Sequence, residues 1–256
     1  MVSFWLGVAL AFQPTPTSQG VEPHRVHHAH PEVQAQLHFA PAFTRWRQAH
    51  GPWFAQFDEV TEEPIAMWGR GIDLPVHDEG ELVSALSGLL RAHPDLFGTE
   101  RGQLSLRSAH YVDRVDTWYV DFDVLRDGLP LYRGGVLTRI KHGRLVMARV
   151  TTGGDAPVEG DLRIGEMTAL REAIRQGLAP DATHTDAEIT PMLLERTGVH
   201  GTSLRKVYEV RTRTAQPPGI WVAFVDGSTG NNGAGVYFTN VEGDVHNNHF
   251  VSNEGG

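Results

Sequence analysis

The sequence predicts an α+β fold built from two small antiparallel-sheet units, each covered by helix. Three observations carry this prediction. Apolar and polar residues alternate over 118–124, next to turn residues. Leucines recur at helical spacing over 82–90, which indicates a helix with one buried face. Beyond residue 160 a second helical pattern precedes further strands, and a Gly-, Asp- and Pro-rich segment over 151–160 separates the two units.

Composition limits the class of protein. Of the 256 residues 40% are hydrophobic and 21% charged, which is enough apolar material for a folded core. The 22 Lys and Arg against 31 Asp and Glu leave a net charge of −9. Because phosphate binding needs a basic face, we expect no nucleic-acid partner. Cysteine is absent, which excludes disulfides, thiolate metal sites and thiol nucleophiles.

The first 42 residues contain no predicted element of the fold. Residues 2–12 are an apolar run too short to span a membrane, so we expect no membrane span. Residues 1–12 resemble a secretory signal peptide, although no Lys or Arg precedes the apolar run; a docked N-terminus is the alternative. Residues 13–42 are predicted to be a flexible linker because prolines interrupt them repeatedly.

The predicted linker carries four histidines: His24, His27, His28 and His30. Imidazoles at this density can bind zinc or nickel weakly. A structural metal site also needs fixed geometry and supporting hydrogen bonds, which a linker does not supply. We therefore expect no metal site and no cofactor, and we keep these histidines as the metal-ligand candidates.

The first unit, predicted over 43–152, begins with a helical turn over 43–49 and a hairpin formed by 53–58 and 65–68. A helix is then predicted to begin at Asp78, with Glu81 completing a capping box. Its buried face carries four leucines, and the helix ends before Pro94. These leucines are Leu82, Leu86, Leu89 and Leu90.

An antiparallel meander completes the first unit. The alternating strand 118–124 leads to a turn at Asp127-Gly128, and a return strand is predicted over 129–140, interrupted at Gly134-Gly135. Another turn at 141–144 precedes a strand over 145–150. The carboxylates of Asp121 and Asp123 share one face of the first strand, where they could bind a cation or act as an acid–base pair. We favour the alternative that they form the solvated face of a half-buried sheet, because the alternation itself predicts such a face.

The second unit, predicted over 161–245, contains two helices followed by strands. Met167, Leu170, Ile174 and Leu178 have helical spacing. Thr190-Pro191 is predicted to cap a second short helix that ends at Gly198. Strands are predicted over 204–213, 219–226 and 235–241. Residues 246–256 are predicted to be a polar tail, which contains the histidine pair His246 and His249.

Motifs for catalysis are missing from the sequence, so no catalytic residue is predicted. It contains no His-Glu-x-x-His, no Gly-x-Ser-x-Gly and no Walker loop. The Gly-rich stretch 227–235 lies between predicted strands, where a hairpin loop is expected instead of the helix N-terminus that a phosphate cradle requires.

Several stretches resemble the N-terminal part of the propeptides of thermolysin-like and fungalysin-like secreted metalloproteases. These stretches are WFAQFD (53–58), WGRG (68–71), LFG (96–98), WYVDFD (118–123), DGLPLY (127–132) and GRLV (143–146). The first unit thereby resembles the FTP domain of that family. Residues 165–230 more faintly resemble its PepSY module, whose Asp-Ala-x-Thr-Gly ending corresponds to DGSTG (226–230) here.

The resemblance implies a cystatin-like or propeptide-like architecture and the role of a propeptide. That role is inhibition or folding assistance of a secreted zinc metalloprotease, in cis or in trans, in a secreted or periplasmic location. The matching motifs are structural, and the 256 residues contain no protease domain, so protease activity is not implied. Two alternatives stay open: a periplasmic or surface module that binds a small ligand or metal, and a hydrolase whose site is assembled from distant residues.

Overall fold

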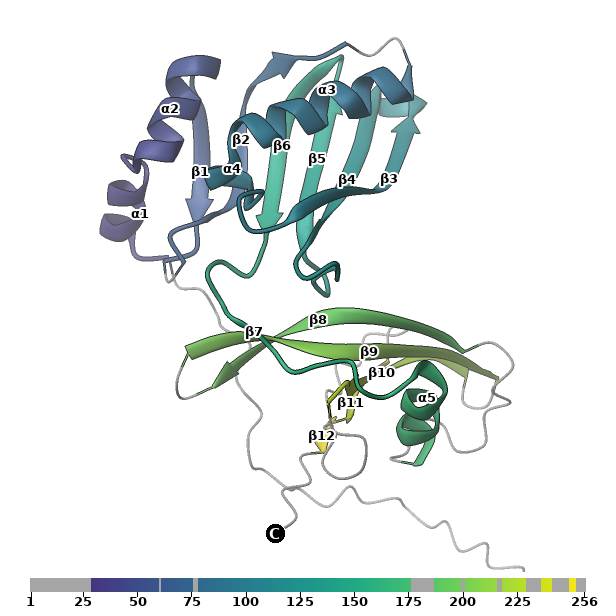
Figure 1. Ribbon diagram of the computed structural model, residues 1–256. Helices are drawn as coiled ribbons and strands as arrows, with labels where there is room; N and C mark the ends of the chain where they lie inside the picture. Colours follow the sequence, from purple (N-terminus) through teal and green to yellow (C-terminus); the bar gives the residue numbers. More distant parts are fainter. Residues whose placement is uncertain are drawn as a thin grey trace, which may run out of the picture.

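The computed structural model describes residues 29–59, 61–75, 78–175, 187–198, 201–215, 218–228, 236–240 and 249–251 (Figure 1). Their strands form two six-stranded sheets, one above the other in Figure 1, and helices pack on both. The predicted α+β class, with two mainly antiparallel sheets that are each covered by helix, is confirmed. Among the described residues no helix is long and apolar enough to cross a membrane.

The first sheet has the strand order β1-β2-β6-β5-β4-β3, and all its pairs are antiparallel. Its strands are β1 (Trp53–Phe57), β2 (Pro64–Asp73), β3 (Gln103–Val112), β4 (Thr117–Leu125), β5 (Gly135–Lys141) and β6 (Arg144–Thr151). The helices before and between them are α1 (Pro31–Leu37), α2 (Pro41–His50), α3 (Glu79–Ala92) and α4 (Pro94–Phe97), and a 3₁₀ turn, η1 (Asp113–Val115), joins β3 to β4. The predicted hairpin and meander are therefore present, whereas β3 was not predicted.

Helices cover one face of the first sheet and enclose its core with it (Figure 1). The helix α3 begins as predicted, because the Asp78 carboxylate accepts a hydrogen bond from the Glu81 N–H at 2.8 Å. Its fully buried leucines are Leu82, Leu86 and Leu90. Leu89 is only partly buried, because it lies at the margin of the face that α3 turns to the sheet.

Both predicted two-residue turns are present. Asp127 and Gly128 have φ values of 52° and 76°, and His142 and Gly143 have 49° and 71°. Positive φ at both central residues defines the type I′ turn, whose twist matches that of antiparallel strands. The return strand differs from the prediction: β5 starts only at Gly135, and residues 129–134 leave the first sheet to contact the second.

The predicted linker is wrong in its described part. Residues 31–37 form α1 and residues 41–50 form α2, each with a proline at its first position, where the missing N–H costs nothing. Phe43 and Trp46 of α2 are completely buried in the first core. Pro31 and Pro41, two of the prolines that suggested a linker, therefore start helices, and apolar side chains behind them dock those helices on the sheet.

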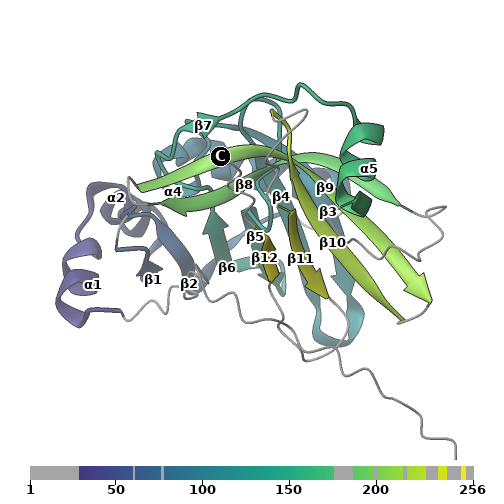
Figure 2. The ribbon, with the colours of Figure 1, turned by 90° about the horizontal axis from the view of Figure 1, so that it is seen from below.

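The second sheet has the order β12-β11-β10-β9-β7, with β8 paired to β9 (Figure 2). Its strands are β7 (Val158–Glu159), β8 (Glu188–Gly198), β9 (Gly201–Ala215), β10 (Pro218–Asp226), β11 (Val236–Asn240) and β12 (His249–Val251). The helix α5 (Glu166–Arg175) packs on one face of β9 and β10. The strands predicted at 204–213, 219–226 and 235–241 are β9, β10 and β11. The short pair between β7 and β9 is parallel.

The helix predicted to begin at Thr190-Pro191 is wrong, because β8 occupies this segment. Pro191 is tolerated in the strand for a geometric reason. The Leu193 N–H points away from β9 and donates to the Pro130 carbonyl. Residues two apart in a strand point the same way, so the missing N–H of Pro191 also lies on the outer side, where the ladder needs no donor.

The buried face of α5 matches the predicted one only in part: Leu170 is buried and Ile174 packs against the same core, as predicted. Ala169, Leu170 and Ala173 are buried, whereas Met167 is 65% exposed. The two alanines bring the helix backbone close to the sheet, so the small residues, which a search for large apolar residues ignores, mark the packed face. Leu178 lies outside the described residues.

The two sheets meet at the loop between β4 and β5. The Tyr132 N–H donates to the Leu193 carbonyl at 2.8 Å, and the Leu193 N–H donates to the Pro130 carbonyl at 2.8 Å. Leu131, Leu193 and Leu204 form a small buried cluster between the sheets. The loop that carries the propeptide-like DGLPLY motif thus links the two halves of the molecule.

Candidate functional site

The two edges of the first sheet are the strands β1 and β3. An edge strand presents a row of backbone N–H and C=O groups that a further strand can pair with. Proteins either cover such an edge or use it for binding an extended segment of a partner. The two edges of this sheet differ in this respect.

At the β1 edge, the side chains of Gln34 and His38, in and next to α1, form hydrogen bonds with the outward backbone groups of the strand. We call these contacts, together with the neighbouring contact of His30, the β1 seal. The Gln34 amide donates from Nε2 to the Phe57 carbonyl at 2.9 Å and accepts the Phe57 N–H on Oε1 at 3.0 Å. It thereby reproduces the pair of hydrogen bonds that a neighbouring strand would make. The His38 Nε2 accepts the Ala55 N–H at 3.4 Å. The His38 Nδ1 lies 2.8 Å from the Gln34 carbonyl, which can only accept, so Nδ1 carries the proton.

His30, a predicted metal-ligand candidate, belongs to the same seal. Its Nδ1 lies 2.6 Å from Glu59 Oε2, and its backbone N–H donates to Glu59 Oε1 at 2.6 Å. Hydrogen bonds from Gln34 and His30 lower the pKa of Glu59 to about 2. The Glu59 carboxylate therefore stays ionised at neutral pH and holds the first turn of α1 beside the end of β1.

The β3 edge is open among the described residues, since no strand pairs with its outer side. Cross-strand neighbours share a face, so Leu106 lies on the face of buried Phe122 and Tyr111 on that of Trp118. These two side chains face the core layer, yet they are 45% and 40% exposed. The core layer thus leaves these two side chains partly uncovered at the β3 edge, and a further strand paired with β3 would cover both.

A bulge divides β3 between Leu106 and Ser108 and turns the Arg107 side chain across the sheet. The Arg107 guanidinium donates to the Asp123 carboxylate, at 2.9 Å from Nε, and to the Gly134 carbonyl. Arg139 pairs with Asp121 at 3.2 Å. The two carboxylates considered as a cation site are thus each paired with an arginine. Among the described residues no three His, Asp or Glu side chains are grouped so that they could hold a metal ion.

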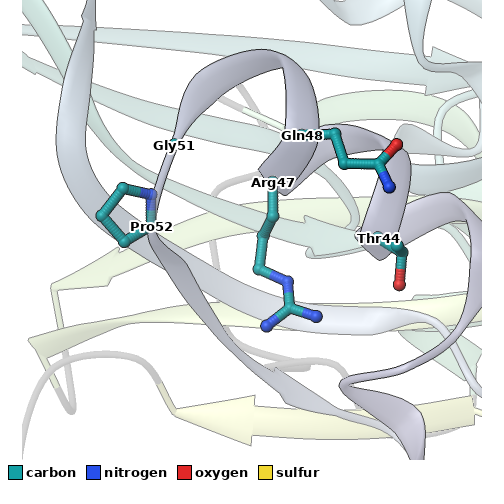
Figure 3. Close-up of a pocket in the computed structure, with 5 residues that line it drawn as sticks. All are labelled: Thr44, Arg47, Gln48, Gly51 and Pro52. Atoms are coloured by element: carbon teal, nitrogen blue, oxygen red, sulfur yellow. The ribbon is translucent and has the colours of Figure 1, made fainter.

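An open depression lies at the end of α2 (Figure 3). Its lining residues are Thr44, Arg47, Gln48, Gly51 and Pro52. The Arg47 guanidinium donates to the His38 carbonyl at 2.8 Å and thereby connects α2 to the α1 region. The lining contains no acid, histidine or lysine, so it offers no side chain that could act as a general acid or base.

The other histidine candidates are not tested by the described residues. His24, His27 and His28 lie outside them, as does His246, and only the backbone of His249 is described, in β12. The segment 229–235 of the Gly-rich stretch also lies outside. Before it, the Asp226 carboxylate accepts hydrogen bonds from the Ser228 N–H at 2.8 Å and from the Arg205 Nε at 2.6 Å, a local turn arrangement.

Sequence reasoning missed the residues that define both edges. Gln34 lies in the segment interpreted as linker, although Pro31 followed by Glu32 is a helix-start signal. The strand β3 carries serines, an arginine and a histidine between its apolar residues, so its alternation is weak. Alternation of Leu104 and Leu106 with serines is the signal that could have indicated it.

Comparisons with known proteins add little to this geometry. No family model matches the chain, and no curated protein sequence matches it. Among solved structures, the chain is similar to the Bacillus megaterium YpeB C-terminal domain, with a TM-score of 0.38 and 10% sequence identity, over 84% of this chain and 99% of that one. A likeness at this TM-score and identity supports no functional statement, so the proposals below rest on the residues themselves.

Proposed function

We propose that this chain is a non-enzymatic, exported binding module that acts as inhibitor or folding chaperone of a secreted zinc metalloprotease. Two separate arguments support the proposal. The order of motifs over 53–150 resembles a metalloprotease propeptide, and the first sheet presents an open edge suited to binding a protein segment. On this proposal the FTP-like unit spans 43–152 and the PepSY-like unit spans 161–245.

The open β3 edge is the single observation that carries the proposal. Leu106 and Tyr111 face the core layer but are covered on one side only. A strand of the protease that paired with β3 would gain backbone hydrogen bonds and would bury these two side chains. Binding of this kind needs shape and backbone groups and no catalytic side chain, which agrees with the lack of catalytic motifs in the sequence.

The β1 seal supports the choice of β3 over β1. Hydrogen bonds from Gln34 and His38 occupy the outward groups of Phe57 and Ala55, so a partner would have to displace α1 before it could pair there. At β3 no described strand pairs with the outer side. Pairing with β3 therefore costs a partner less free energy than pairing with β1.

The test is an inhibition assay with the full chain and a matched pair of variants. The chain is titrated against thermolysin-like and fungalysin-like enzymes while cleavage of a peptide substrate is followed. We expect saturable inhibition of one of them, weakened at least tenfold by Leu106→Glu, because a buried carboxylate at the paired edge costs binding energy. Phe54→Glu, which changes an exposed side chain on the β1 strand, should leave inhibition unchanged.

Rapid digestion of the chain by every enzyme, without any slowing of substrate cleavage, would contradict the inhibitor role. Equal weakening by both variants would contradict the assignment to β3 and leave the inhibitor role in place. Hydrolysis of a substrate by the chain alone, abolished by one substitution that preserves the fold, would contradict the non-enzymatic part of the proposal.

A further inference from the structure

Two histidines that are distant in sequence meet at the surface of the helical layer. His50 is the last residue of α2, and His93 lies between α3 and α4. Their Nε2 atoms are 3.2 Å apart. Both side chains are partly buried, and both rings contact the buried indole of Trp46, with centroid distances of 4.4 Å and 4.8 Å. The packing against Trp46 therefore fixes the direction of both imidazoles.

The distance between the two nitrogens matches that of two ligands of one metal ion. Zinc binds imidazole nitrogen at about 2.0–2.1 Å in tetrahedral geometry, so two nitrogens on the same ion lie about 3.3 Å apart. The two ring planes are inclined by 70°, with centroids 5.3 Å apart, so the rings do not stack.

We propose that His50 and His93 form a binding site for a divalent transition metal ion, of the imidazole-preferring class that includes Zn²⁺, Ni²⁺ and Cu²⁺. The described residues supply no third ligand, so water or a group of another molecule completes the coordination shell. This site is separate from the histidines of the N-terminal segment and from the proposed protease-binding edge.

The surroundings keep the two imidazoles available as ligands. Burial, together with the neighbouring His93, lowers the pKa of His50, and burial also lowers the pKa of His93. Neutral imidazole is the form that binds metal. The 3.2 Å contact between the two Nε2 atoms is a hydrogen bond in which one ring donates, so a bound ion replaces this hydrogen bond and the donating ring carries its proton on Nδ1 instead. Asp95 and Arg45 both lie near His93 and are paired with each other, so their opposite charges largely offset there.

A bound ion would add a link between elements that packing and the Arg45–Asp95 ion pair already join here. His50 ends α2, whereas His93 belongs to the junction of α3 and α4. Metal binding to the folded state only therefore stabilises the docking of α2 on the rest of the helical layer.

The experiment uses the full chain carrying His24→Ala, His27→Ala and His28→Ala, so that the N-terminal histidines do not contribute. Zn²⁺ is titrated while thermal unfolding is followed. We expect a saturable rise of about 5 °C at zinc concentrations about 100-fold above the dissociation constant. His50→Gln and His93→Gln should each weaken binding at least tenfold, whereas His110→Gln, on β3, should not.

A second measurement avoids variants of the pair, which could disturb packing on Trp46. Zn²⁺ should protect His50 and His93, and not His110, from acylation by diethylpyrocarbonate, as read by mass spectrometry. The proposal is overturned by a chain without a saturable thermal shift, by a shift that survives both Gln substitutions, or by acylation of His50 and His93 at the same rate with and without zinc.

Discussion

Trp53 shows how strongly single residues constrain the first core. Its indole is 2% exposed and lies directly over Gly69, its partner on β2. A Cβ at position 69 would come within 2.6 Å of the indole ring. The glycine is therefore required by close packing of an aromatic ring on a strand backbone. By contrast, a Cβ at Gly88, on the exposed side of α3, would meet nothing within 4 Å.

These two glycines give a matched prediction at the residue scale. Gly69→Ala should lower the free energy of unfolding by about 1–3 kcal/mol, because the indole must move within a filled core. Gly88→Ala should raise it by about 0.5–1 kcal/mol, because alanine reduces the backbone entropy lost in an exposed helix. Urea denaturation of both variants measures the difference. The same sign for both changes would contradict the packing argument.

The histidine pair predicts how stability depends on pH. Burial lowers the pKa values of His50 and His93 below the ordinary value of 6.5, while Asp95 opposes and Arg45 adds to this shift at His93. The unfolded chain then binds protons before the folded chain does. The free energy of unfolding should be constant above pH 6.5, fall as the pH drops below it, and level off once the folded pair also protonates.

A double variant isolates this effect. His50→Gln with His93→Gln should flatten the stability profile just below pH 6.5, as measured by urea denaturation at each pH. Glu59 acts in a different window: its lowered pKa stabilises the fold above pH 4.5, and this contribution is lost as the pH falls toward 2. An unchanged slope in the double variant would show that other groups govern the range near neutral pH.

At the scale of elements, α1 is the feature that decides which edge is free. Its seven residues carry the Gln34 amide opposite Phe57, where it takes the place of a strand. A helix this short is marginal alone, so the contacts of Gln34, His30 and His38 with β1 and Glu59 hold it. The seal should therefore be sensitive to one side chain.

We expect Gln34→Ala to accelerate amide hydrogen exchange at Phe57 at least about fivefold, the factor that corresponds to about 1 kcal/mol for one lost hydrogen bond. Gln36→Ala is the matched control, because Gln36 lies exposed on the same helix. In Gln36→Ala, the Phe57 amide should exchange at the same rate as in the unmodified chain. Exchange measured by NMR that is equally fast in both variants would show that helix formation alone, and not the Gln34 amide, protects β1.

Elements with a strong local signal could be predicted from the sequence, and elements set by distant partners could not. The alternation over 118–124 and the turn at Asp127-Gly128 predicted β4 and its turn because both signals lie within a few residues. The strand β8 was missed because Thr190-Pro191 is a good helix start locally, and only pairing with β9 overrides it. The meeting of His50 and His93, 43 residues apart, has no local signal at all.

For the whole molecule, the small cluster of Leu131, Leu193 and Leu204 is the main apolar contact between the sheets. Lys206 adds an ion pair with Asp127 at 3.0 Å, and the Tyr132 ring packs edge-on against Phe224 at 4.5 Å. These contacts couple the two halves without making one continuous core. Whether the two halves unfold together should therefore depend on Leu193, which is completely buried in the cluster.

We expect Leu193→Ala to lower stability by about 2–5 kcal/mol and to separate the unfolding of the two sheets. Calorimetry should show one transition for the unmodified chain and two for the variant. Tryptophan fluorescence should mainly follow the transition of the first unit, because Trp46, Trp53, Trp68 and Trp118 lie there and Trp221 lies on β10 of the second sheet. Leu145→Ala, within the first core, is the control and should lower that transition instead. A single shifted transition in Leu193→Ala would show that the halves stay coupled without the cluster.

The pairing of β2 with β6 also has a consequence for the order of events during synthesis. Met67 lies opposite Ala148, so the pair of β2 and β6 joins residues that are far apart along the chain. Until residue 151 has been made, the hairpin of β1 and β2 has no neighbour on its inner side, and the leucines of α3 have only part of a surface to cover. The chain loses conformational entropy when it closes the long loop between β2 and β6, and the contacts that compensate for this loss form only after β6 has been made. This favours slow completion of the sheet. A nascent chain of this protein therefore carries the hairpin of β1 and β2 without its neighbour from the completion of β2 until β6 is made, and this hairpin is prone to association with other chains for most of the time that the first unit is being translated.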